Sequence, residues 1–185
     1  MEPEKRLSPA PWQQALLVTL RVGIGWHLLY EGYLKLTTPG GWSAVGYLQG
    51  LPPGPLYGLL HAIPDHPSVL TAVNLLNAWG LAAAGLGLMV GFLTPLACLG
   101  GMLMLALYYL ANPPWVGVMT APGEGNYLYV DKNLVEFVAL AVVLAFNTGK
   151  MAGLDALVSR WRELRRQRPA PRPRSARAAD APSKP

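Results

Sequence analysis

The first apolar stretch of the chain carries four ionisable side chains whose types suit proton exchange and anion binding. They are Arg21, His27, Glu31 and Lys35. An α-helix turns by about 100° per residue, so His27, Glu31 and Lys35 all lie within roughly 120° of Arg21 around the helix axis, in the same direction from it. Each charge would cost on the order of 2.5 to 3.5 kcal/mol facing lipid at a bilayer centre, so we expect this stripe to face protein or water.

Two later apolar stretches add polar side chains at a similar expected depth. The second carries Asn74 and Asn77 in its first turns, and the last carries Lys132 and Glu136 four residues apart. Arg21 lies deeper, because Glu31 is about 15 Å further along the helix. The residues expected to surround one outward-facing polar chamber are His27, Glu31, Lys35, Asn74, Asn77, Lys132 and Glu136.

These side chains have two interpretations. In the functional one, carboxyl and imidazole groups among apolar helices take up and release protons, and the other groups bind a substrate. The candidate catalytic residues are Glu31, Glu136 and His27, and the candidate substrate-binding residues are Arg21, Lys35, Asn77 and Lys132. In the structural one, the Lys and Glu residues form i, i+4 pairs, the asparagines hold helices together, and His27 is a hydrogen-bonded core residue.

Four apolar segments position these side chains. They cover about 16–36, 69–93, 95–110 and 133–148. The first three approach or exceed the roughly 20 residues that cross a bilayer as a helix. The last one spans only if Lys132 extends toward one interface and Asn147 and Thr148 lie at the other. The sequence therefore predicts an all-α integral membrane four-helix bundle, with three spans and a re-entrant last segment as the alternative.

Composition excludes several classes of protein. Of 185 residues, 52% are hydrophobic and 14% charged, which is too apolar for an ordinary soluble domain. Basic residues gather at the two ends, unlike those of a nucleic-acid-binding domain, so we expect no nucleic-acid partner. The single Cys98 excludes a disulfide framework and cysteine-ligated metal centres. We expect no haem, flavin or metal in this chain, since His27 is the one histidine inside a predicted span.

The charges beside the spans predict the orientation. Lys5 and Arg6 precede the first span and an Arg-rich segment, 160–177, follows the last, and both favour the cytoplasm under the positive-inside rule. An even number of spans places both termini there. Arg21 interrupts the first apolar run and no small-residue cleavage site follows, which indicates an uncleaved signal anchor. The expected location is the inner cell membrane, as a multi-pass protein.

The remaining segments complete the expected organisation. The divisions are a cytoplasmic N-terminus over 1–12, a transmembrane domain over 13–149, an amphipathic inner-leaflet helix over 150–167 and a disordered basic tail over 168–185. In the Pro- and Gly-rich outer connections, 43–49 and 56–63 are long enough for short interfacial helices. The bilayer is the expected partner, with anionic lipids attracted to the tail.

Three local patterns follow one another along the apolar part. They are Arg21, Gly25-Trp26, Leu29-Tyr30-Glu31-Gly32 and Lys35-Leu36; then Leu76-Asn77-Ala78-Trp79-Gly80-Leu81; then Tyr108-Tyr109, Asn112-Pro113-Pro114, Lys132-Asn133-Leu134 and Gly153-Leu154-Asp155. In this order they resemble the DoxX-like membrane family, in particular its DoxD branch, the small subunit of thiosulfate:quinone oxidoreductase. The resemblance implies a four-helix membrane fold and electron transfer from a sulfur compound to quinone with a second subunit.

Three functions follow as hypotheses. The first is a membrane subunit of a quinone-linked oxidoreductase, with thiosulfate as the donor that the resemblance implies and a second oxidoreductase subunit or a second copy of the chain as partner. The second is a non-catalytic scaffold or assembly subunit, in which the same charges fix helix register. The third is a small-solute or proton-coupled transporter, against which four spans without an internal repeat are few for alternating access.

Overall fold

The described part of the chain is helical. The computed structural model describes residues 9–114 and 129–167, of which 78% lie in helices and none in a strand. The elements are α1 (Pro11–Thr37), α2 (Val45–Gln49), α3 (Tyr57–His61), the 3-10 helix η1 (Ile63–Asp65), α4 (Pro67–Val90), α5 (Thr94–Ala111), α6 (Lys132–Ala145), α7 (Thr148–Met151) and α8 (Leu154–Arg166). The expected disordered tail, 168–185, lies outside the described residues.

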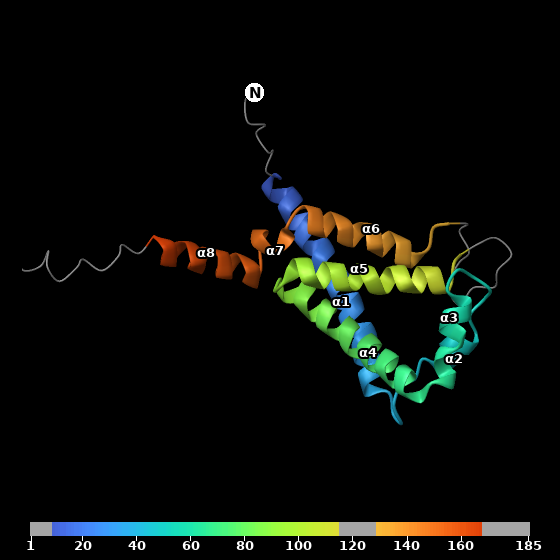
Figure 1. Cartoon of the computed structure of the whole chain (residues 1–185). Helices are drawn as coiled ribbons and strands as arrows, with labels where there is room; N and C mark the ends of the chain where they lie inside the picture. The colour runs from blue at the N-terminus through green and yellow to red at the C-terminus, as the bar shows by residue number, and fades with distance from the viewer. Residues whose placement is uncertain (1–8, 115–128, 168–185) are drawn as a thin grey trace, which may run out of the picture.

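The four predicted apolar segments coincide with the four longest helices. In Figure 1, α1 packs on α4, α4 on α5 and α5 on α6, and α6 also contacts α1. Two of them, α4 and α5, are long and apolar enough to cross a membrane. By contrast, α1 carries three charged side chains, and the 14 residues of α6 reach only about 21 Å, less than the roughly 30 Å of a hydrocarbon core.

Small residues let α1 and α4 approach closely. A Cβ on Gly32 would lie 2.5 Å from the backbone nitrogen of Ala82, and one on Gly25 would lie 2.9 Å from Leu88 Cβ. A Cβ on Gly85 would likewise collide with the backbone of Leu29. Gly25 and Gly32 of α1 therefore leave room for the close approach of α4, and the backbones of the two helices are in direct contact.

The core is small and the outward surface is apolar. Leu28, Leu81, Leu88, Leu140 and Val143 are the centre of one buried cluster shared by the long helices. On the outside of α4 and α5, four large apolar side chains are between 61% and 70% exposed: Leu76, Trp79, Leu96 and Leu103. A surface of this kind is costly in water and is the surface that helices present to lipid.

The short helices cover one end of the long ones, which we call the loop end. Ala44, Leu48 and Leu51 are buried there against Ala111 at the end of α5. The side chain of Asn74 fixes this connection, because its Oδ1 accepts a hydrogen bond of 2.9 Å from the backbone N–H of Ala44. The expected short helices over 43–49 and 56–63 are thus present as α2 and α3.

The opposite end, which we call the α8 end, consists of two turns in contact. Gly91, with φ of 66°, ends α4, and Gly153, with φ of 151°, precedes α8. A Cβ on Gly91 would lie 2.8 Å from the Cα of Gly153, so neither position has room for a side chain. The amphipathic helix expected over 150–167 is present in its larger part as α8, but it is interrupted before Leu154, since Ala152 is extended and Gly153 has a positive φ. From there α8 leaves in a new direction, away from the long helices (Figure 1).

Candidate functional site

His27 of α1 and Glu136 of α6 meet between the two helices. The Nδ1 atom of His27 lies 2.8 Å from Oε1 of Glu136, and the two side chains are 39% and 22% exposed. The contact is an ion pair when the imidazole is protonated and the carboxyl group is ionised. It joins the two least apolar of the four long helices, and it combines an imidazole with a carboxyl group, the two kinds of side chain that most often act as general acids and bases.

The start of α6 fixes the position of Glu136. Asp131 caps this helix, because its Oδ1 accepts a hydrogen bond of 2.9 Å from the backbone N–H of Leu134. Its other oxygen accepts a hydrogen bond of 2.9 Å from the side-chain amide of Asn133. Both Asp131 and Asn133 are buried, so the first turn of α6 is anchored by side chains as well as by packing.

Glu31 and Lys35 form a second pair one turn further along α1. Lys35 Nζ lies 2.9 Å from Glu31 Oε2, and the side chains are 15% and 41% exposed. The ammonium group also lies 5.3 Å from the ring centroid of Trp42, in the connection to α2. Lys35 is therefore held between a carboxylate and an aromatic face.

The two pairs belong to one electrostatic group. Glu31 interacts with His27 as well as with Lys35, and Lys132, at the start of α6, lies within electrostatic range of both Glu31 and His27. We predicted that Glu31, Lys35, Lys132 and Glu136 lie around one site. In the structure these four side chains interact as one electrostatic group through His27, which contacts Glu136.

Asn77 of α4 and Tyr108 of α5 bring the other two long helices to this group. The Tyr108 hydroxyl interacts with the Asn77 side chain and lies within electrostatic range of Glu31. Four buried atoms here have no partner at hydrogen-bonding geometry among the described residues: Asn77 Oδ1, Tyr108 Oη, Glu136 Oε2 and His27 Nδ1, whose contact with Glu136 is an ion pair by distance alone. Unsatisfied buried polar atoms are rare in folded proteins, so their presence together marks a place where a ligand or water completes the structure.

We call these residues the polar cluster: His27, Glu31, Lys35, Asn77, Tyr108, Lys132 and Glu136. Every long helix contributes at least one of them. Its groups include proton donors, proton acceptors and cations. Among the described residues no group of three His, Cys, Asp or Glu side chains is placed to hold a metal ion.

Two residues predicted for this site lie elsewhere. Asn74 binds the backbone of Ala44, as a structural residue would. Arg21 is 2% exposed and its Nη1 donates a hydrogen bond of 2.8 Å to the backbone oxygen of Thr148, at the α8 end. Its distance along α1 explains the difference, because ten residues separate it from Glu31 by about 15 Å. The structure therefore does not bring Arg21 to the polar cluster.

Asp155 is the centre of the contacts at the α8 end. Its Oδ1 accepts a hydrogen bond from the backbone N–H of Leu93 and its Oδ2 one from that of Thr94, each of 2.9 Å, which caps the start of α5. Its own N–H donates to Gly91 O at 2.8 Å. Burial opposes the charged carboxylate, but the hydrogen bonds from Thr94 and Leu93, together with nearby Arg21, outweigh it and lower the pKa of Asp155.

Sequence reasoning missed the roles of Tyr108 and Asp155. Tyr108 was not among the predicted site residues, although its place on α5 contained a signal. Cys98, Gly101 and Leu105, which are buried, precede it at spacings of three and four residues, so it continues the interior face. Asp155 offered no such signal, because its partners lie in a turn distant in the sequence.

Comparison of the chain with protein-family models, with curated proteins and with solved structures finds no significant match. The resemblance to the DoxX-like family therefore depends only on the local sequence patterns quoted above.

Proposed function

We propose that the chain is the membrane subunit of a quinone-linked oxidoreductase and that the polar cluster binds the quinone headgroup. The observation that carries this proposal is the contact of 2.8 Å between His27 and Glu136, with unpartnered buried polar atoms beside it. A quinone is an apolar molecule with two carbonyl oxygens, so it suits a polar site between apolar helices. The helices that surround the site expose apolar side chains on their outer surface. An apolar substrate therefore reaches the site from the lipid side of these helices.

The unpartnered atoms fit both redox forms of such a headgroup. The Tyr108 hydroxyl donates to a carbonyl oxygen of the quinone, while Asn77 Oδ1 and Glu136 Oε2 accept hydrogen bonds from the hydroxyl groups of the quinol. The mixture of both therefore supports a substrate that changes from acceptor to donor during the reaction.

The chemistry assigned to the protein is proton exchange. Reduction of a quinone consumes two electrons and two protons, and each proton is bound to one carbonyl oxygen. His27 and Glu136 share a proton across their contact and supply it to one oxygen, and Glu31, a carboxylate beside Lys35, takes up the second proton from solvent and passes it to the other oxygen. Lys35 and Lys132 stabilise the negative charge that develops on the oxygens before protonation.

The electrons come from a second subunit in this proposal. The resemblance to the DoxD branch implies thiosulfate as their source, and the sulfur donor gives up two electrons for each quinone reduced. The protein contribution at the polar cluster is to bind the headgroup, to exclude bulk water and to deliver protons.

The same proposal includes a membrane placement. The helices α1, α4, α5 and α6 form a four-helix transmembrane bundle in the inner cell membrane, with both termini cytoplasmic and the loop end outside. Its support is the apolar exposed surface of α4 and α5 and the absence of Lys and Arg from the connection between α1 and α4. Ser43→Cys and Ser68→Cys should react with an impermeant thiol reagent added outside intact cells, and Arg160→Cys only after permeabilisation.

The function is tested by purification and assay. The protein is isolated in a mild detergent with its native partners, bound lipid-soluble molecules are extracted, and thiosulfate-dependent reduction of a soluble quinone is measured. We expect quinone in the extract, a co-purifying soluble-facing subunit and turnover that requires both chains. A partner without any quinone or turnover would instead support the scaffold hypothesis.

The scaffold hypothesis has one observation in its favour. Glu31 pairs with Lys35 and Glu136 pairs with His27, so most charges of the polar cluster satisfy one another within the protein. Paired charges of this kind fix the register of helices without any ligand. The two hypotheses predict different effects on turnover and stability when a charged residue of the polar cluster is replaced by a neutral residue of the same shape.

A further inference from the structure

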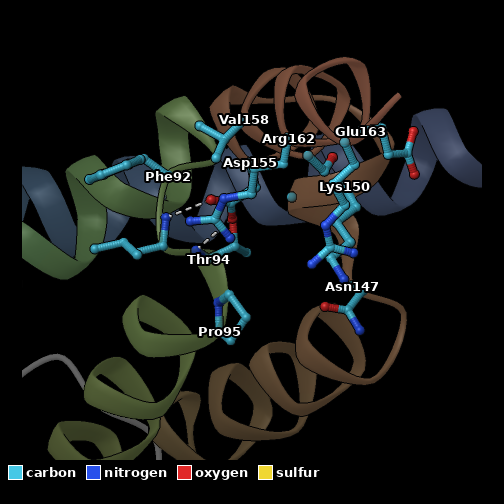
Figure 2. A pocket seen from close by; sticks show the side chains of 13 residues that line it. Phe92, Thr94, Pro95, Asn147, Lys150, Asp155, Val158, Arg162 and Glu163 are labelled. Atoms are coloured by element: carbon cyan, nitrogen blue, oxygen red, sulfur yellow. Dashed lines mark hydrogen bonds between the residues drawn. The ribbon is translucent and has the colours of Figure 1, made fainter. Parts of the chain in front are cut away.

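A surface cleft at the α8 end has the features of a lipid headgroup site. Its volume is about 560 Å³, and it lies between α8, the start of α5 and the turn that connects α6 to α7. Figure 2 shows Phe92, Thr94 and Pro95 on the α5 side and Asn147 and Lys150 on the other, with α8 above them. The cleft is far from the polar cluster, and the proposed quinone chemistry makes no use of it.

The cleft has an excess of positive charge. Lys150, Arg162 and Arg166 line it, against the two acids Asp155 and Glu163. Asp155 is already engaged, because its two carboxylate oxygens accept the N–H groups of Leu93 and Thr94, shown by the dashed lines in Figure 2. Three cations therefore face the cleft with one carboxylate left to oppose them, which favours an anion.

The opposite wall of the cleft is apolar. Phe92 and Leu93 line it and are 45% and 52% exposed, and Pro95 and Val158 add further apolar surface. A free inorganic anion gains nothing from such a wall. A phospholipid gains from both walls, because its phosphate lies among the cations while its glycerol and acyl groups contact apolar side chains.

The face of α8 turned away from the cleft supports the same partner. Leu157, Trp161 and Leu164 form an apolar stripe and are between 52% and 65% exposed. Arg165 is stacked on Trp161, with its guanidinium carbon 3.6 Å from the ring centroid. A helix with an apolar stripe flanked by arginines is typical of binding at an anionic bilayer surface.

We infer that this cleft binds the phosphate headgroup of an anionic membrane phospholipid, held by Lys150, Arg162 and Arg166. The inference rests on the membrane placement proposed above and is independent of quinone. The bound lipid ties α8 to the start of α5 at the level of the headgroups. This is a defined site for one lipid, distinct from the diffuse attraction of a basic tail.

The test is a lipid titration of the full chain. The protein, purified in a non-ionic detergent, is titrated with phosphatidylglycerol or with phosphatidylcholine, and bound lipid is counted by native mass spectrometry. We expect one phosphatidylglycerol to be retained at concentrations at which phosphatidylcholine is not. The double variant Lys150→Gln, Arg162→Gln should raise the half-saturating concentration by about 25-fold, at roughly 5-fold for each basic side chain.

The matched control removes the same charge from the other side of α8. The variant Arg160→Gln, Arg165→Gln leaves the cleft lining intact and should change the half-saturating concentration by less than about 3-fold, since neither residue lines the cleft. All four substituted side chains are exposed, so the fold is retained in both variants. The variant Arg162→Lys keeps the charge and should bind like the unmodified chain.

Three results would overturn the inference. Equal loss of binding in the two double variants would show diffuse electrostatic attraction. Displacement of phosphatidylglycerol by millimolar inorganic phosphate would assign the cleft to a free anion. Equal retention of phosphatidylcholine would show that the headgroup charge is not recognised. Because the readout is binding and not turnover, none of these results depends on the quinone proposal.

Discussion

His27 Nδ1 of α1 lies 2.8 Å from Glu136 Oε1 of α6, although the two residues come from opposite ends of the helical part of the chain. Each of the two helices has a polar face, and exposing such a face to lipid costs free energy. When the two helices pack through His27 and Glu136, these polar faces contact each other instead of lipid. The same contact brings together an imidazole and a carboxyl group. One arrangement therefore serves the packing of α1 on α6 and, in the function that we propose, the exchange of protons.

Glu136→Gln should lower quinone-dependent turnover by about 100-fold, because the amide keeps the shape of the side chain but cannot exchange a proton. His27→Gln should have a similar effect, and the double variant should be little worse than either, since the two groups act as a unit. Turnover of the purified complex is the measurement. The controls are Asp65→Asn and His61→Gln, which alter exposed residues of the loop end. Additive losses in the double variant would contradict a shared proton.

Glu31→Gln should abolish turnover while the thermal unfolding midpoint stays within a few degrees of that of the unmodified chain. The added substitution Lys35→Met removes the unpaired cation and should leave activity absent. In the scaffold hypothesis the outcome is reversed, because Glu31→Gln lowers stability and the second substitution restores it. Unfolding midpoint and turnover are measured on the same preparations, so the two hypotheses give opposite results.

Gly32→Ala should destabilise the protein by about 1 to 3 kcal/mol, since the new methyl group would lie 2.5 Å from the backbone of Ala82. The matched control is Gly23→Ala in the same helix, because a Cβ at Gly23 meets nothing within 4 Å. That change should be neutral or stabilise by up to about 1 kcal/mol through helix propensity. Unfolding in detergent provides the measurement. Equal stability of the two variants would mean that α1 and α4 are not in close contact.

Much of the fold was predictable from the periodicity of the sequence. The apolar segments recur at lengths suited to helices, and the four longest helices lie where they were expected. In the polar stripe of α1, Arg21 is buried, Lys35 is mostly buried and His27 and Glu31 are partly buried, while Trp26 and Tyr30 on the other side are 57% and 48% exposed. Both results depend on local spacing alone, which is why sequence reasoning reached them.

The parts that sequence reasoning missed depend on contacts between distant segments. The pairing of His27 with Glu136 follows from the packing of α1 on α6, whereas spacing alone pointed to local Lys and Glu pairs. Arg21 was expected to lie deeper than Glu31 and was still listed as a substrate-binding residue, but its partner is the backbone oxygen of Thr148, in a segment distant in the sequence. The break before α8 depends on the contact between Gly91 and Gly153, which no local pattern specifies.

The stability of the protein should depend on Asp155 at acid pH. Its pKa lies below the usual value of 3.8, so its stabilising contribution is complete above that value and is lost as the pH falls through the lowered pKa. Asp155→Ala should destabilise by about 0.5 to 2 kcal/mol at neutral pH, as the loss of a helix cap does. Unfolding midpoints between pH 2 and pH 6 should then vary less in the variant. An unchanged pH dependence would show that Asp155 does not hold α8 in place.

The central claim is that a quinone binds at the polar cluster, and photolabelling tests it most directly. The protein in membranes is irradiated with a photoreactive quinone analogue, and the labelled residues are identified by mass spectrometry. Label should appear in α1 between His27 and Lys35 and near Glu136 in α6, and an excess of unlabelled quinone should abolish it. Label confined to the lipid-facing side chains Trp26 and Trp79, and unaffected by competing quinone, would contradict the claim.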